Sequence, residues 1–79
     1  MKKSEARILI FLSNAEDRHK YAKHISYKLN IDYGYLIGLL NGLKFFKVIT
    51  PMKRGNKVFY RINKPAYVDK ALVRLFGIH

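Results

Sequence analysis

The chain has 79 residues, of which 16 are Lys or Arg and five are Asp or Glu, giving a formal net charge of +11 at pH 7. Hydrophobic residues make up 49%, which is typical of a folded chain and excludes a disordered one. Residues 1–79 are long enough for one domain with a small core but too short for the layered architecture of most enzymes. So large an excess of positive charge attracts polyanions, so nucleic acid is the leading partner.

The first half of the chain has the apolar spacing of three helices. Ser4 can cap the first helix, and Asp17 is a good cap for a second helix over residues 18–29. A three-residue turn ending in the capping residue Asp32 leads to a third helix, which has leucines at helical spacing over about residues 33–45. Two short helices joined by such a turn predict a helix-turn-helix.

The pattern then changes to that of a β-hairpin. Residues 48–50 and 58–62 are β-branched or aromatic, and the basic segment 53–57 between them contains a Gly-Asn pair that suits a hairpin turn. Alternation predicts that the even-numbered residues of the second run pack on the helices, while Phe59 and Arg61 face the other way.

A last helix follows the hairpin. Asn63 or Lys64 can cap it, Pro65 suits its first turn, and Gly77 can end it. The predicted order is α-α-α-β-β-α. This order describes an α+β fold with a three-helix core, a two-stranded β-hairpin and a C-terminal helix.

Two segments carry a resemblance to a known family. The first is ISYKLNIDYGYLIGLL, in which Ile25 and Ser26 take the place of an apolar-small pair and Asp32 caps the following helix. The second is LKFFKVITPMKRGNKVFYRI, which leads into the basic hairpin. Over residues 8–62 the chain resembles winged helix-turn-helix proteins, in particular small archaeal and bacterial transcription regulators of the MarR-like and ArsR-like kind. Lys47 stands where this family often has glycine.

The resemblance implies a transcription regulator that binds double-stranded DNA. It places the third helix, about residues 33–45, in a groove and the wing, residues 53–57, on the backbone or in the minor groove. In similar regulators the first and last helices form a homodimer, which would present two recognition helices about one DNA turn apart. The candidate DNA-binding residues are Tyr33, Tyr35, Asn41, Lys53, Arg54, Asn56, Lys57, Lys20, Lys28 and Arg61.

The expected recognition helix contains no basic residue from Tyr33 to Leu43. Tyrosine hydroxyls and the Asn41 amide are therefore the groups expected to contact bases, while Lys and Arg elsewhere contact phosphates. Gly34 and Gly38 would let another surface approach this helix closely. Two alternatives remain open from the residues: the apolar third helix docks on a partner protein, or the basic surface and exposed aromatic rings bind RNA.

Several classes of function have no support in the sequence. There is no cysteine, and neither the spacing of His19 and His24 nor the acids near them indicate a metal site. The acidic residues are scattered, and no catalytic Ser-His-Asp pattern or Gly-rich phosphate loop is present. The longest apolar run, residues 8–12, is far below the roughly 20 residues that span a bilayer. We therefore expect a cytoplasmic protein that is not an enzyme and has no cofactor, metal, membrane segment or small-molecule ligand.

Overall fold

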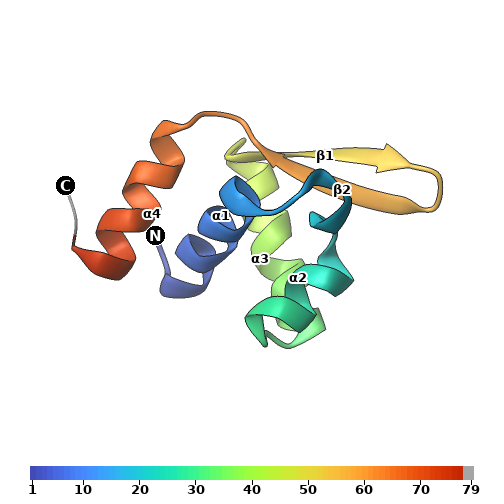
Figure 1. Ribbon diagram of the computed structural model, residues 1–79, viewed down its shortest axis with the longest axis horizontal. Helices are drawn as coiled ribbons and strands as arrows, with labels where there is room; N and C mark the ends of the chain where they lie inside the picture. The colour runs from blue at the N-terminus through green and yellow to red at the C-terminus, as the bar shows by residue number, and fades with distance from the viewer. Residues whose placement is uncertain (78–79) are drawn as a thin grey trace.

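The structure is a computed structural model and describes residues 1–77. Its elements confirm the predicted order and fold class, with one additional short 3₁₀ helix before the second α-helix. In chain order they are α1 (Lys3–Asn14), η1 (Asp17–His19), α2 (Ala22–Leu29), α3 (Tyr33–Phe45), β1 (Ile49–Arg54), β2 (Lys57–Ile62) and α4 (Ala66–Phe76). The two strands form an antiparallel hairpin that extends away from the helices as a wing (Figure 1).

Helix α1 lies at the centre of the helical body and contacts α2, α3, α4 and strand β2 (Figure 1). Its inward side chains meet leucines of α3 and the first residue of β1. Fully burying a Leu or Ile side chain contributes about 1.5–3 kcal/mol, so this core fixes the helix-turn-helix and the base of the wing together. The largest fully buried side chains are Ile8, Leu9, Leu12, Ile25, Leu36, Leu40 and Ile49.

The turn between α2 and α3 has the geometry that the sequence predicts. Asn30 ends α2 in a left-handed conformation with φ 53°, and Ile31 behind it is buried. The Ser26 hydroxyl donates a hydrogen bond of 2.6 Å to the Ile31 carbonyl. At the start of α3, the Asp32 carboxylate accepts a hydrogen bond of 3.1 Å from the Tyr35 N–H, which confirms Asp32 as the cap.

The chain leaves α3 through a left-handed residue. Lys47 has φ 60°, and its N–H donates a hydrogen bond of 3.0 Å to the Lys44 carbonyl. The next N–H, of Val48, donates to the Leu43 carbonyl at 2.9 Å. A lysine therefore occupies a backbone conformation that glycine adopts more easily, at a cost of about 1 kcal/mol.

The predicted caps of the first and second helices are wrong. Helix α1 begins at Lys3, before Ser4, and the Glu5 carboxylate accepts the Lys2 N–H at 2.7 Å. The second helix begins at Ala22 rather than near residue 18, so Asp17 does not cap it.

The late start of α2 has a tertiary cause. The Lys20 carbonyl accepts a hydrogen bond of 2.9 Å from the Tyr60 N–H of β2, and Tyr21 forms an isolated antiparallel bridge with Phe59. This pairing holds the segment before α2 in an extended conformation alongside the wing. A helix cannot include these residues while their backbone groups pair with β2.

The cap predicted for the last helix is also wrong. The N-cap of α4 is Pro65, whereas Asn63 bonds back to the base of the wing. The Asn63 N–H donates to the Val48 carbonyl at 3.0 Å, its Nδ2 donates to the Lys47 carbonyl at 2.6 Å, and its Oδ1 accepts from the Thr50 hydroxyl. The predicted end at Gly77 is confirmed, because this residue follows α4 with φ 67°.

The hairpin is longer and its turn tighter than the sequence predicts. The strands pair from Ile49 opposite Ile62 to Arg54 opposite Lys57, which leaves a two-residue turn. Tyr60 and Ile62 pack against the core as predicted, but Val58 is 38% exposed and does not join it.

Candidate nucleic-acid interface

Helix α3 presents a surface with few side-chain atoms. Its leucines point into the core. Gly34, Gly38 and Asn41 are exposed, which agrees with the expectation that they face outward. A Cβ atom added at Gly38 would have no neighbouring atom within 4 Å. The packing of the chain therefore does not require glycine there, and the open backbone is available to an external partner.

Two tyrosines flank this surface at the start of α3. Tyr33 is 46% exposed and Tyr35 is 51% exposed. At about 100° of rotation per residue they lie on opposite sides of the helix. Tyr33 lies on the side that faces the wing, where it lines a cleft, whereas Tyr35 is outside that cleft.

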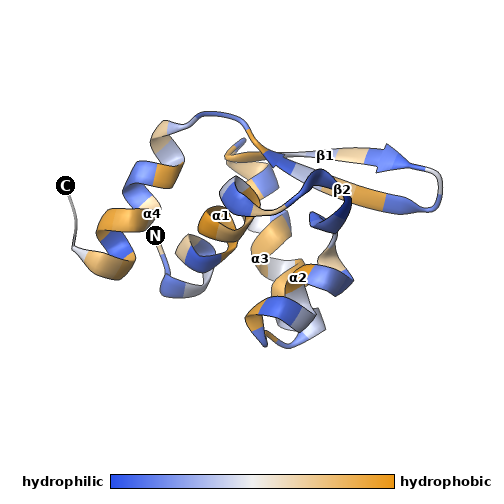
Figure 2. Ribbon diagram, viewed as in Figure 1, coloured by the Kyte–Doolittle hydropathy of each residue, from blue (hydrophilic) through white to orange (hydrophobic). Residues whose placement is uncertain are grey.

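The wing carries the predicted basic residues near its tip, and Figure 2 shows that this end of the hairpin is hydrophilic. Lys53, Arg54, Asn56 and Lys57 are all exposed. The turn depends on Gly55, whose φ of 63° is a conformation that residues with a Cβ atom rarely adopt. The wing therefore presents three cations on a short, tight hairpin.

Lys20 and Lys57 differ from free surface lysines. The ammonium of Lys20 lies 3.0 Å from Asp17 Oδ1, and its side chain is only 17% exposed. The hydrogen bond and the charge of Lys20 both lower the pKa of Asp17, so the pair stays ionised at neutral pH. Lys57 Nζ lies 4.2 Å from the centroid of the Tyr21 ring.

The other two candidate cations are exposed on separate elements. Lys28 is in the last turn of α2, and Arg61 is on β2 opposite Thr50. The structure thus does not gather all the predicted residues into one small site. It places them around α2, α3 and the wing.

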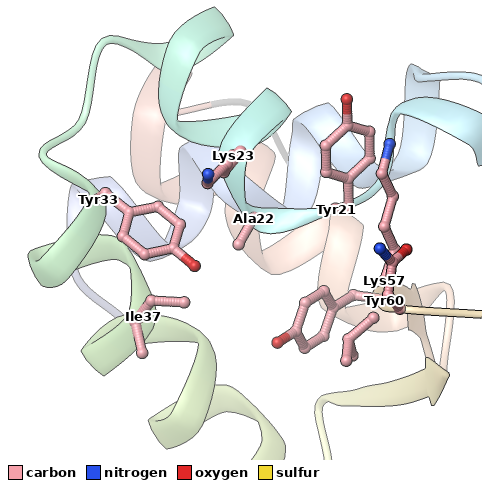
Figure 3. A pocket seen from close by; sticks show the side chains of 9 residues that line it. Tyr21, Ala22, Lys23, Tyr33, Ile37, Lys57 and Tyr60 are labelled. Carbon is pink, nitrogen blue, oxygen red and sulfur yellow. The ribbon is translucent and has the colours of Figure 1, made fainter.

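A cleft of about 400 Å³ separates α3 from the wing (Figure 3). Of the predicted residues it brings together Tyr33, Asn56 and Lys57, but not Tyr35 or Asn41. Sequence reasoning missed this cleft and most of its walls. The remaining lining residues are Tyr21, Ala22, Lys23, Ile37, Val58 and Tyr60.

His19 and His24 are partly buried. The rings of His19 and His24 stack with centroids 4.4 Å apart and an interplanar angle of 13°. Burial lowers the pKa of His24, and the nearby His19 and Lys28 lower it further. Among residues 1–77, no group of three or more His, Cys, Asp or Glu side chains is arranged to hold a metal ion.

Helices α1 and α4, the predicted dimer elements, pack against each other within the chain. Ala6 and Leu9 of α1 and Ala71 of α4 are fully buried within the chain. Val73 and Phe76 of α4 remain exposed. None of the helices described in residues 1–77 has the length and apolar character needed to cross a membrane.

An exposed aromatic pair lies at the end of α3, where Phe45 follows Asn41 by one helical turn on the same side of the helix. Phe45 is 77% exposed and Phe46 is 72% exposed, and their rings meet edge to face with centroids 5.2 Å apart. Large exposed aromatic side chains of this kind are enriched at protein interfaces.

The comparisons with known proteins concern the fold. The chain matches no protein-family model, and a search of curated proteins gives no match. Among solved structures it is similar to reduced HlyU from Vibrio cholerae N16961, with a TM-score of 0.60 and 18% sequence identity. The alignment covers 95% of this chain and 92% of HlyU. This likeness confirms the winged-helix fold, with the hairpin as the wing.

Proposed function

We propose that the protein is a transcription regulator that binds double-stranded DNA with α3 in a groove and the wing on the backbone. One observation carries this proposal: Tyr33 and Ile37 of α3 and Asn56 and Lys57 of the basic wing line the same cleft, so both elements can face one duplex. In this proposal, residues 1–79 form a single DNA-binding domain. The surplus of positive charge supplies attraction that does not depend on base sequence.

The surface of α3 is suited to a DNA groove. A major groove about 12 Å wide admits an α-helix, and the absence of side chains at Gly34 and Gly38 permits close approach to its wall. Tyr35 and Asn41 then contact base edges, since an asparagine amide can bond to adenine through two hydrogen bonds. In this arrangement uncharged side chains, rather than Lys or Arg, contact the bases.

Phosphate contacts come from the surrounding cations. Lys53 and Arg54 of the wing and Lys28 at the end of α2 extend into solvent, and Arg61 adds a fourth cation on β2. Lys20 contributes less than the sequence predicts because Asp17 already pairs with it. If about 5 phosphates are neutralised per subunit, the logarithm of affinity falls with the logarithm of salt concentration at a slope of about −4 to −5.

The proposed regulator is a homodimer that associates through α1 and α4. Support comes from the exposed apolar side chains of Val73 and Phe76, which no element covers among residues 1–77. A two-fold dimer would place two α3 helices about one DNA turn apart. Sedimentation equilibrium tests this part of the proposal: wild type is expected to be dimeric and Phe76→Lys monomeric, whereas a monomeric wild type contradicts it.

The DNA-binding proposal is tested by competition between duplex DNA, single-stranded DNA and structured RNA at several salt concentrations, followed by fluorescence anisotropy. We expect duplex DNA to compete best and the salt slope to lie near the value above. A slope near zero contradicts nucleic-acid binding. Tighter binding to structured RNA favours the RNA alternative instead.

Docking of a partner protein is a second candidate because Phe45 and Phe46 are exposed together at the end of α3. The double variant Phe45→Ser, Phe46→Ser tests it. If the rings serve DNA binding, this change weakens duplex binding, because Phe45 lies one turn beyond Asn41 on the same side of α3. Loss of a purified protein complex with unchanged duplex affinity favours the docking function.

A further inference from the structure

The cleft between α3 and the wing has two phenol groups that converge. Figure 3 shows the Tyr33 ring projecting from α3 and the Tyr60 ring from β2, with both hydroxyls directed toward the space between them. Burial raises the pKa of Tyr60, and the nearby Tyr33 phenol raises it further. The two rings lie on opposite sides of the cleft, which brings their hydroxyls together and places the Tyr33 phenol near Tyr60.

The walls of the cleft are largely apolar. Ile37 of α3, Ala22 at the start of α2 and Val58 of β2 line it. Figure 3 shows Ile37 and Ala22. Its volume of about 400 Å³ lies within the range of about 300–1,000 Å³ that is usual for small-molecule sites. Such walls suit a flat aromatic group better than a phosphate, which is charged and strongly hydrated.

The rim of the cleft is cationic and polar. Lys23 of α2 and Lys57 of β2 lie at its edge, and Asn56 at the wing turn adds an amide. The Lys57 ammonium lies over the Tyr21 ring, which also lines the cleft. The combination of an aromatic, apolar interior with a basic rim is complementary to one nucleotide, whose base enters while its phosphates remain at the rim.

A base within a duplex cannot enter such a cleft because it is stacked on both sides. We propose that the cleft between α3 and the wing binds the base of an unpaired nucleotide at a duplex end or bulge, with Tyr33 stacking on it and the Tyr60 hydroxyl hydrogen-bonding to its edge. This inference deepens the proposed function and rests on it, since the cleft lies between the two elements proposed to contact the duplex. It assigns Tyr33 to the cleft rather than to the groove.

The experiment compares three DNA probes by fluorescence anisotropy: a blunt duplex, the same duplex with one unpaired nucleotide at an end, and the same duplex with a one-nucleotide bulge. Stacking of a base on an aromatic side chain contributes about 1–3 kcal/mol, so unpaired probes are expected to bind at least about fivefold more tightly than the blunt duplex. With 2-aminopurine at the unpaired position, we expect its emission to change on binding. Free nucleoside monophosphate serves as a further competitor.

Three variants locate the effect. Tyr33→Ala is expected to remove the preference for unpaired probes, and Tyr60→Phe, which keeps the ring, to reduce it. Tyr27→Ala is the matched control because Tyr27 lies on α2, is 79% exposed and does not line the cleft. Circular dichroism verifies that each variant is folded.

The outcomes separate this inference from the proposed function. Equal binding of blunt and unpaired probes, or a preference that Tyr33→Ala leaves intact, overturns the inference. A Tyr60→Phe variant that loses affinity equally for all three probes also overturns it, because the cleft then binds a backbone phosphate of paired DNA. Salt-dependent binding of the blunt duplex supports the proposed function in each of these cases. Binding of unpaired probes without any binding of the blunt duplex supports the cleft and contradicts the duplex regulator.

Discussion

The ammonium group of Lys57 lies over the ring of Tyr21, with Nζ 4.2 Å from the ring centroid. Lys57 is the first residue of β2, and Tyr21 is the residue that precedes α2. The contact therefore connects the tip half of the wing to the helical body. It also keeps one of the wing's cations beside the cleft, where Tyr21 forms a wall.

We expect Lys57→Met to lower the free energy of unfolding by about 0.5–1 kcal/mol, the contribution of a cation over an exposed aromatic ring. Lys53→Met is the matched control because it removes a charge from the same hairpin, opposite Val58, without touching Tyr21. Urea denaturation measures the free energy of unfolding of both variants. Equal stability of the two variants would show that the Lys57 contact contributes nothing.

Gly38→Ala is expected to increase the free energy of unfolding by about 1 kcal/mol, since alanine favours a helix and its Cβ would meet no atom of the chain within 4 Å. The same variant is expected to weaken duplex binding about tenfold, because the methyl group obstructs close approach to α3. Gly42→Ala lies one turn further along the same side of α3, and its Cβ also meets nothing within 4 Å, so it should raise stability in the same way. A duplex affinity of Gly38→Ala equal to that of wild type would exclude close approach at Gly38.

Tyr35→Ala is expected to weaken binding to duplexes selected from a random pool more than binding to unselected duplexes. The reason is that a side chain reading bases contributes only where the right base is present, at about 1–3 kcal/mol per good contact. Tyr27→Ala, on the exposed side of α2, is expected to change neither. Equal losses for Tyr35→Ala on both kinds of duplex would remove its base-reading role.

Lys47→Gly is expected to raise the free energy of unfolding by about 1 kcal/mol, because glycine adopts the φ of 60° found at this position without a steric penalty. Lys44→Gly is the matched control, since it removes the same charge from within α3. There glycine should lower the free energy of unfolding by about 0.5–1 kcal/mol relative to alanine-like residues. Thermal and urea denaturation of the two variants should therefore shift in opposite directions.

The histidine pair predicts a dependence of stability on pH. The pKa of His24 is lowered in the folded protein, first by burial and then by His19 and Lys28, so the folded state favours the neutral ring. The unfolded chain keeps a pKa of about 6.5 and takes up protons first as the pH falls. The free energy of unfolding should therefore decrease as the pH falls below about 6.5, and the decrease should end below the lowered folded pKa.

His24→Gln is expected to reduce this decrease, because the glutamine side chain does not titrate. Urea midpoints at about pH 7.5 and about pH 5.5, on either side of the usual histidine pKa, measure the effect for both proteins. The same pH dependence in wild type and variant would mean that His24 does not contribute to it.

Local signals in the sequence predicted the helix-turn-helix because the relevant contacts are local. Asp32 caps α3 three residues from the N–H it accepts, and Ser26 bonds across the same turn. Helix starts fixed by distant contacts were predicted wrongly. Asp17 looked like a cap, but pairing of Lys20 with Tyr60 delays α2, and Asn63 closes the wing instead of capping α4.

Part of the candidate site could likewise be predicted from the sequence, and part could not. Helical periodicity alone placed Tyr35 and Asn41 outside the core, and the structure finds both exposed. Periodicity could not pair Tyr33 with Tyr60, because 26 intervening residues separate them. The register of β1 and β2 determines which residues of the wing face α3.

Composition, apolar spacing and turn residues thus determined the charge of this protein, its order of elements and the outward surface of α3, since each depends on neighbours along the chain. Only the tertiary structure decided where α2 begins, which cations are free and where a cleft forms. Those features depend on β2 packing beside Lys20 and Tyr21, a long-range contact that no local pattern encodes.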